Sequence, residues 1–397
     1  MKKAPKSLLS SNLANKTVLV RVDYNVPTQD GIIIDDYKIR SSTATIQYLL
    51  KNNCKVVLLS HIGDPKGKQD DSLSLMDVRF ALGRLLEKQI KFANIAACEN
   101  SIKFMDFGEV LMLENLKFSP LETSKKEEDR LEYVKNLSKL ADALVFECYG
   151  AESNLASINA LAGKLPTYMG IHFEEEVSTA QLLAEKSKES VTAIIGNDDL
   201  NKALDLISVL VNGKNKLLLG GEIALYFLNA MGTETGSKEL ETKILSKVNK
   251  YVKAAKKNGC EIILPVDYLA VKARDSSLKP IEVQTQTLQK DLIAMDIGPK
   301  TLVSFREIIE ASNVVIWFGS MGEYKLEQFN KGTEAIGEYI ALSTSKDCYK
   351  VAFGGIVTHA MNLLKIKPKR FNFVSLDSSL FVDFMQNKES DILTLLS

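Results

Sequence analysis

Short apolar runs rich in β-branched residues alternate with amphipathic stretches, and this alternation restricts the possible folds more than any other feature of the chain. Continuous apolar runs separated by helices are typical of parallel strands, because a parallel sheet is covered on both faces. In the first half the pattern predicts strands at Thr17–Val22, Lys55–Ser60, Val110–Glu114 and Ala143–Glu147, and helices at Arg40–Leu50, Asp77–Lys88 and Glu127–Leu140.

The second half repeats this pattern, with strands predicted at Val191–Ile195, Lys216–Leu219, Glu261–Leu264, Val314–Trp317 and Lys350–Phe353. Between the halves, His172–Lys188 is predicted to form one helix that connects two domains. We therefore predict an α/β protein with two doubly wound, Rossmann-like parallel-sheet domains. The expected division is an N-terminal domain over residues 1–171, the connecting helix over 172–188, a C-terminal domain over 189–379 and a tail over 380–397.

Charge and cysteine content exclude several kinds of partner. The 397 residues carry 50 Lys and Arg against 50 Asp and Glu, so no net charge favours nucleic acid or an anionic membrane. The five cysteines form no Cys-x-x-Cys pair, which argues against a disulfide framework or a zinc site and favours a reducing compartment. No apolar run approaches the roughly 20 residues of a membrane helix, and the N-terminus does not resemble a signal peptide. We therefore expect a cytoplasmic protein.

Glycines follow the predicted strands of the second half. In open parallel sheets, ligands bind beyond the carboxyl ends of the strands, and glycine there lets backbone N–H groups approach a phosphate. On this ground we assign a nucleotide site to Gly196, Gly220, Gly221, Gly319, Gly322, Gly354 and Gly355. A tight turn explains any single pair more simply, but four such turns in one half favour a nucleotide. Neither the dinucleotide-binding glycine fingerprint nor a P-loop is present.

Polar residues follow the predicted strands of the first half. Asp23 and Asn25 come after the first strand, His61 comes after the second, and Glu147 is the last residue of the fourth. Asp23 and Asn25 are candidates for ligand binding but could equally cap a turn. His61 could be a binding or a structural residue, and both alternatives stay open.

At these turns the sequence resembles the phosphoglycerate kinase family, and the resemblance covers nearly the whole chain. The resembling segments are VLVRVDYNVP at Val18–Pro27, VVLLSHIGDPKG at Val56–Gly67, VLMLENLKFSP at Val110–Pro120, LPVD at Leu264–Asp267, DIGPKT at Asp296–Thr301, VIWFGSMG at Val315–Gly322 and FNKGT at Phe329–Thr333. The resemblance implies that the first domain binds 3-phosphoglycerate and the second binds ATP or ADP with Mg²⁺. It also implies a hinge that closes the domains for phosphoryl transfer and a tail that packs on the first domain.

On the phosphoglycerate side, the family's binding residues are present as Asp23, Asn25 and His61. The resemblance places the family's catalytic arginine at Lys38 and a phosphate-binding arginine at Lys117. Phosphoryl transfer depends on cations that neutralise the phosphoryl oxygens, and arginine grips two oxygens where lysine is a point charge. We therefore expect Lys38 to be a weak catalytic replacement and Lys117 to retain some substrate binding.

Other basic positions of this site are lost. A third arginine of the family falls on Asp64, whose carboxylate would repel a phosphate. The family's His-Arg after the fourth strand falls on Ser153-Asn154, and its next histidine falls on Ala156.

The nucleotide side departs from the family in the same way. The family's triphosphate lysine falls on Asp199 and its second lysine on Ala203, while Lys202 lies one place off and could substitute in part. The asparagine after the strand with Trp317 falls on Phe318, and the ribose-binding glutamate falls on Lys325. A turn whose aspartate helps to hold Mg²⁺ reads FGGIV at Phe353–Val357, and a late glycine-rich turn reads SLDSSL at Ser375–Leu380.

These substitutions support two main hypotheses. The first is a pseudoenzyme that retains the family's fold and binds a ligand or an unidentified protein partner, with no metal site of its own. The second is an active phosphoglycerate kinase, or a related small-molecule kinase, that uses Lys38, Lys117 and Lys202 in place of the usual residues. A dinucleotide-dependent oxidoreductase rests on fold analogy alone. We expect the first, as a monomer, with doubtful use of ATP, ADP and Mg²⁺.

Overall fold

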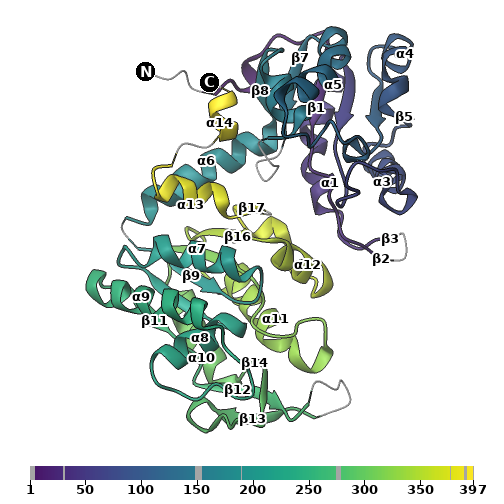
Figure 1. Ribbon diagram of the computed structural model, residues 1–397. Helices are drawn as coiled ribbons and strands as arrows, with labels where there is room; N and C mark the ends of the chain where they lie inside the picture. The colour runs from purple at the N-terminus through teal and green to yellow at the C-terminus, as the bar shows by residue number, and fades with distance from the viewer. Residues whose placement is uncertain are drawn as a thin grey trace. The chain divides into compact units, whose positions relative to one another are not determined.

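The computed structural model of the chain describes residues 5–29, 32–147, 154–188, 190–273, 279–375, 377–388 and 391–396. The chain divides into two compact units, Met1–Ser178 with Glu389–Ser397, and Thr179–Lys388 (Figure 1). The division falls within helix α6 (Ile171–Lys186), close to the helix predicted at His172–Lys188. Residues 380–388, which the sequence assigned to the C-terminal tail, group with the second unit.

The first unit is built on a six-stranded sheet in which each neighbouring pair is parallel. The strands, in order across the sheet, are β5 (Ile90–Ala93), β6 (Val110–Leu113), β4 (Lys55–Leu59), β1 (Thr17–Arg21), β7 (Ala143–Phe146) and β8 (Thr167–Met169). The helices are α1 (Tyr37–Ser41), α2 (Thr43–Lys51), α3 (Met76–Leu86), α4 (Cys98–Lys103), α5 (Glu127–Leu140), the start of α6 and α14 (Asp391–Leu395). A short hairpin pairs β2 (Thr28–Gln29) with β3 (Ile32–Ile33).

The second unit contains a six-stranded parallel sheet with the strand order of doubly wound nucleotide-binding folds. Its strands, across the sheet, are β11 (Glu261–Ile263), β10 (Lys216–Leu219), β9 (Thr192–Ile195), β15 (Val314–Phe318), β16 (Tyr349–Phe353) and β17 (Phe373–Ser375). Its helices are α7 (Leu200–Leu210), α8 (Gly221–Ala230), α9 (Thr242–Asn258), α10 (Pro299–Glu310), α11 (Lys331–Glu338), α12 (Gly355–Leu363) and α13 (Ser379–Met385).

A separate antiparallel sheet belongs to the second unit. It consists of β13 (Ile281–Gln284), β12 (Asp267–Val271) and β14 (Ile293–Ile297), and Figure 1 shows it at the lower end of this unit. Two of these strands resemble turns in the sequence because each contains an aspartate: Asp267 is the first residue of β12, and Asp296 is the last but one of β14.

Burial of the central strands explains why their sequences are continuously apolar. All five residues of β15 are buried, and its Trp317 is fully buried and stacks on Phe371 at 6.1 Å between ring centroids. In the first unit, Val18 and Val20 of β1 belong to one apolar cluster with residues of β4 and β7. Burial of both faces removes the polar alternation that a half-exposed strand would show.

The predicted fold class, two parallel-sheet α/β units, is confirmed. The structure adds β5, β8, β17 and the antiparallel sheet, which the apolar pattern did not indicate because these strands are short or partly exposed. Among the described cysteines, Cys54, Cys98, Cys260 and Cys348 are free and buried, and Cys148 lies outside the described residues. Within the described ranges, no helix combines the length and apolarity that crossing a membrane requires.

Candidate functional site

The first unit places Asp23 and Asn25 where the loops after β1 and β4 meet. Asp23 Oδ1 accepts a hydrogen bond from the Asn25 N–H (3.0 Å), and Asn25 Oδ1 accepts one from the Gly63 N–H (2.9 Å). Asp23 Oδ2 lies 2.6 Å from Lys38 Nζ. Burial acts to raise the pKa of Asp23, but Lys38 and the Asn25 N–H outweigh it and hold the pKa below its usual value. The charge of Lys38 is therefore met by a carboxylate of the same unit.

His61 lies against a buried arginine. Arg21, the last residue of β1, is fully buried, and its Nη2 donates to His61 Nδ1 at 3.0 Å. An arginine can only donate, so Nδ1 accepts and the ring proton lies on Nε2. Burial lowers the pKa of His61 to about 3, and the positive charges of Arg21 and Lys117 act in the same direction. His61 is therefore neutral near pH 7 and contributes no positive charge to an anion site.

The remaining candidates of the first unit divide into two sets. Lys117 is only 7% exposed and lies close enough to His61 for its charge to act on the ring, as does Lys38. Asp64 and Asn154 are exposed, and Ala156 is buried. Ser153 lies outside the described residues. The structure thus brings Asp23, Lys38, His61 and Lys117 together.

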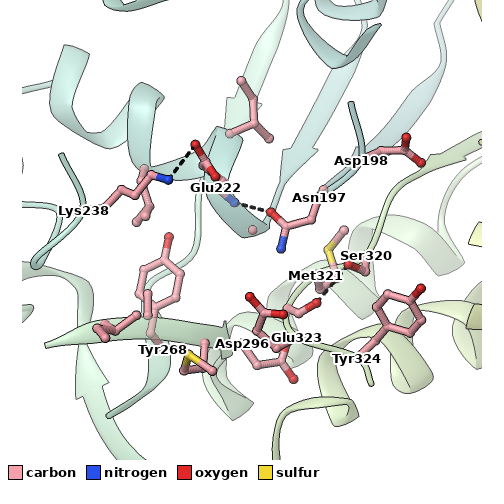
Figure 2. Close-up of a pocket in the computed structure, with 18 of the residues that line it drawn as sticks. Asn197, Asp198, Glu222, Lys238, Tyr268, Asp296, Ser320, Met321, Glu323 and Tyr324 are labelled. Carbon is pink, nitrogen blue, oxygen red and sulfur yellow. Dashed lines mark hydrogen bonds and ion pairs between the residues drawn. The ribbon is translucent and has the colours of Figure 1, made fainter. Parts of the chain in front are cut away.

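The second unit has a cavity of about 490 Å³ at the carboxyl ends of β9 and β15 (Figure 2). The strand order reverses between these two strands, which is where doubly wound sheets bind ligands. The lining includes residues that follow β9, β10 and β15, among them Asn197, Asp198, Gly221, Glu222, Ser320, Met321, Gly322, Glu323, Tyr324 and Lys325, together with Tyr268 and Asp296 from the antiparallel sheet.

The chain's own carboxylate caps helix α7, which follows β9. Asp199 accepts hydrogen bonds from the N–H groups of Asn201 (2.8 Å) and Lys202 (3.1 Å) in the first turn. These are the donors that a helix N-terminus would otherwise offer to a bound anion. Asp199 stands where the resemblance predicts a triphosphate lysine, so a negative group occupies the place of a positive one.

Neighbouring side chains satisfy two further helix N-termini. Asn197 Oδ1 accepts from the Glu222 N–H of α8 at 2.6 Å. Asp198 Oδ1 accepts from the Asp199 N–H at 2.7 Å, and its Oδ2 receives a longer bond of 3.4 Å from the Ile356 N–H of α12. Burial raises the pKa of the Asp198 carboxyl. Three consecutive residues therefore supply acceptors to three different helices.

Lys202, which could have replaced the lost lysines, is paired within the unit. Its Nζ lies 2.7 Å from Asp377 Oδ2, and Asp377 Oδ1 also accepts from the Ser379 N–H at the start of α13 (2.7 Å). Burial opposes the charge of Lys202, but Asp377 outweighs it and raises the pKa. Ala203 is 1% exposed, so the second lysine position of the family lies in the core here.

The glycines at the strand ends are mostly explained by packing within the unit. A Cβ on Gly196 would lie 2.0 Å from the Ser320 carbonyl oxygen, and one on Gly221, which has φ of +57°, would lie 2.3 Å from Asn197 Oδ1. A Cβ on Gly220, Gly319, Gly322 or Gly354 would also lie too close to a backbone or side-chain atom. Gly355 differs, because a Cβ there would have no neighbour within 4 Å.

The lining of the cavity is more acidic than basic. It contains the carboxylates of Asp198, Glu222, Asp296 and Glu323 and the amines of Lys238 and Lys325. Glu222 and Lys238 form an ion pair of 3.1 Å (Figure 2). Asp296 accepts from the N–H groups of Ile297 (2.9 Å) and Gly332 (2.7 Å), and burial raises its pKa to about 7.

Sequence reasoning missed three features of this site. The capping role of Asp199 was visible in principle, since an aspartate before an apolar helical pattern is a common N-cap. The pairing of Lys202 with Asp377 joins residues far apart in the chain and has no local signal. No sequence pattern indicates a role for Tyr268, which lines the cavity. Within the described ranges, no group of three or more His, Cys, Asp or Glu side chains could hold a metal ion.

Comparison with known proteins gives one consistent result. The family model described as phosphoglycerate kinase matches residues 8–388. The chain is 34% identical over 396 residues to phosphoglycerate kinase of Dictyoglomus turgidum, covering 98% of this chain and 97% of that protein. It is 32% identical over 385 residues to the Bifidobacterium longum protein of the same name, covering 95% and 96%. The crystal structure of phosphoglycerate kinase from Pyrococcus horikoshii matches with a TM-score of 0.84, 27% identity and 98% coverage of both chains.

We predict opposite effects on stability for two glycines of this site. Gly196→Ala should destabilise the protein by about 1–3 kcal/mol or more, because its Cβ would meet a backbone oxygen that cannot move alone. Gly355→Ala should be neutral or stabilise by about 0.5–1 kcal/mol, because it adds a helix-favouring residue in open space. Thermal unfolding of both variants measures the difference. Equal melting temperatures would contradict the packing explanation of Gly196.

Glu147 should make stability depend on pH. It is 3% exposed, its Oε1 accepts from the His172 N–H (3.2 Å), and burial raises its pKa from 4.5 to about 8. Between these values the folded state holds a proton that the unfolded state releases, so this contribution to stability falls as pH rises toward 8.

The test is Glu147→Gln, which cannot ionise. Its melting temperature should rise relative to the wild type as pH increases through this interval. Glu185→Gln, at an exposed position, is the control and should follow the wild-type profile. A constant difference between Glu147→Gln and the wild type across pH would show that Glu147 does not titrate in this range.

Proposed function

Since the chain belongs to the phosphoglycerate kinase family, we propose how this member uses the fold: it binds a ligand or partner and has lost most or all phosphoryl transfer. The observation that carries the proposal is the occupation of helix N-termini in the second unit by the chain's own side chains. Asp199 at α7, Asp198 at α12 and Asp377 at α13 are all carboxylates. Each fills a place that favours an anionic ligand.

Electrostatics makes these carboxylates a barrier to a polyphosphate. Two unit charges of the same sign at about 4 Å repel by about 1 kcal/mol in water and about 4 kcal/mol near a protein surface. A nucleotide would also have to displace Asp199 from the first turn of α7, where an aspartate cap contributes about 0.5–2 kcal/mol. These costs replace the gain that the family's lysine would supply, so weak or absent nucleotide binding is the expectation.

The residues present do not fit Mg²⁺-ATP. The donors at the start of α7 already have acceptors, and Lys202 is held by Asp377. The position of the magnesium-holding aspartate, judged by resemblance, is Ile356. Phe318, which by resemblance stands in place of an asparagine, is fully buried and offers no polar group, and the ribose-binding glutamate falls by resemblance on Lys325. We therefore derive no catalytic step through this group.

The first unit supports the same proposal by another route. Lys38 stands in place of the catalytic arginine, and Asp23 already holds its ammonium group at 2.6 Å. A transition-state arginine contributes about 10³–10⁵ in rate to phosphoryl transfer in other enzymes. A lysine paired with a carboxylate offers neither two parallel donors nor an uncompensated charge.

We place this protein in the cytoplasm as a monomer, on the cysteine content and the family.

One observation favours the second hypothesis, an active kinase with altered residues. Lys38 and Lys117 both lie close enough to act on His61, so the first unit keeps a basic cluster that could hold one phosphate group. Such a cluster would hold the phosphate of 3-phosphoglycerate, which an active kinase requires. An activity assay separates the two hypotheses.

We expect turnover with 3-phosphoglycerate, ATP and Mg²⁺ to be at least about 10³-fold below the roughly 1–100 per second of ordinary kinases. The physical reason is the loss of cations around the transferring group in both units. A coupled assay, run in both directions with the Dictyoglomus turgidum protein as the positive control, measures it. Turnover within the ordinary range would overturn the pseudoenzyme proposal and show that the lysines suffice.

A second prediction concerns Mg²⁺-ADP binding, measured by calorimetry. The wild type should bind weakly or not at all, and Asp198→Ala with Asp199→Lys should raise affinity by about tenfold or more, because two repulsive charges leave and one attractive charge enters. The double variant should lose about 1 kcal/mol of stability with the α7 cap.

Asp199→Asn is the matched control for this experiment. Asparagine caps a helix as well as aspartate does, so this variant removes the charge and keeps the cap. It should retain wild-type stability and gain less affinity than the double variant. Micromolar or tighter binding of Mg²⁺-ADP by the wild type would contradict the proposal directly.

A further inference from the structure

Tyr268 carries a buried hydroxyl that its surroundings do not satisfy. The residue lies on β12 and is 2% exposed, and its Oη has no hydrogen-bond partner in the part of the chain that the structure describes. Burial raises the pKa of the phenol, so the group is neutral and keeps its proton. Buried hydroxyls are nearly always hydrogen-bonded, and an exception calls for an explanation.

Tyr268 is one of the residues that line the cavity of about 490 Å³ in the second unit. Figure 2 shows it pointing toward the side of the cavity where Lys238 and Glu222 lie. Ile223, Leu225 and Met295 add apolar surface to the same lining. A cavity of this size with apolar walls and a few polar groups is typical of sites for small molecules.

The charge of the lining selects among small molecules. The lining contains four acidic and two basic residues, and one of the amines, Lys238, is paired with Glu222 at 3.1 Å. Burial raises the pKa values of Asp198 and Asp296, so the negative charge of each is costly where it stands. A positive group in the cavity would stabilise the ionised carboxylates, and a negative group would meet further repulsion.

We propose that this cavity binds a small organic cation, an amine or amidine on an apolar body, with the Tyr268 hydroxyl accepting one of its N–H groups. The inference rests on the proposed function, because it names the ligand class of a site from which nucleotide phosphates are excluded. The expected ligand is thus positively charged, whereas a nucleotide is negatively charged. The apolar body lies against the aliphatic wall, and the positive head lies among the carboxylates.

Three probes of the same shape and different charge test the proposal: benzamidine, which is positive, benzamide, which is neutral, and benzoate, which is negative. Saturation-transfer NMR on the full chain measures their dissociation constants. Benzamidine should bind at least about fivefold more tightly than benzamide, and benzoate should bind most weakly. Equal binding of the three, or tightest binding of benzoate, would overturn the proposal.

Two variants of the exposed ion pair should shift benzamidine binding in opposite directions. Glu222→Gln removes a carboxylate and leaves Lys238 unpaired, so affinity should fall by about fivefold or more. Lys238→Met removes the competing cation, so affinity should rise by a similar factor. Both residues are 40% exposed, and pairs of this kind contribute little to folding. Shifts in the same direction, or no shift, would place benzamidine outside this cavity and contradict the proposal.

Tyr268→Phe tests the hydroxyl itself. It should weaken benzamidine binding by about tenfold, since a hydrogen bond to a charged group is lost. The melting temperature should stay the same or rise, because the variant breaks no hydrogen bond within the described residues. Tyr251→Phe, on α9 and outside the cavity lining, is the matched control and should bind as the wild type does. Unchanged benzamidine binding in Tyr268→Phe would remove the role assigned to the hydroxyl.

Mg²⁺-ADP, titrated in parallel, separates failure of this inference from failure of the proposed function. Micromolar binding of Mg²⁺-ADP that displaces benzamidine would overturn the proposed function. No binding of Mg²⁺-ADP together with equal affinity for the three probes would overturn only the assignment of a cationic ligand.

Discussion

The first backbone N–H groups of a helix have no carbonyl within the same helix as acceptor, so their hydrogen bonds must go to side chains, water or a ligand. In the second unit the acceptors come from the chain itself, namely Asn197, Asp198, Asp199 and Asp377. This arrangement determines the rest of the site. It sets the sign of the charge at the sheet edge, it holds Lys202 through Asp377, and it contributes one of the carboxylates of the cavity, Asp198.

In the first unit, too, side chains of the chain itself serve as partners, in this case for buried or half-buried cations. Its buried arginine, Arg21, needs acceptors, and His61 supplies one while remaining neutral. Lys38 on α1 needs a counter-charge, and Asp23, in the loop after β1, supplies it. Lys38 and Lys202 are therefore each paired with a carboxylate of their own unit. Such balance stabilises a fold, whereas a site for an anionic substrate depends on charges left uncompensated until the substrate arrives.

The apolar pattern predicted the central strands well, because a strand buried on both faces, such as β15, is continuously apolar. It failed at β5, β8 and β17, which are short edge strands, and at β12 and β14, whose aspartates at or near a strand end are typical of turns. At the site, the sequence shows an aspartate, Asp199, where the resemblance predicts a lysine, but it does not by itself show which N–H groups the carboxylate accepts. The partner of Lys202 is 175 residues away, and the isolation of Tyr268 depends on all of its neighbours, so neither can be deduced from local patterns.

The cap on α7 also bears on how this lineage can change. Asp199 now contributes to folding, so a single reversion to lysine would weaken the helix before any nucleotide contact could form. Ala203, packed in the core, imposes a similar obstacle at the second lysine position. Selection for a folded protein alone is then enough to preserve both residues, whatever the ligand. Under the proposed loss of the phosphate site, the stability that these two residues contribute would oppose the return of both lysines.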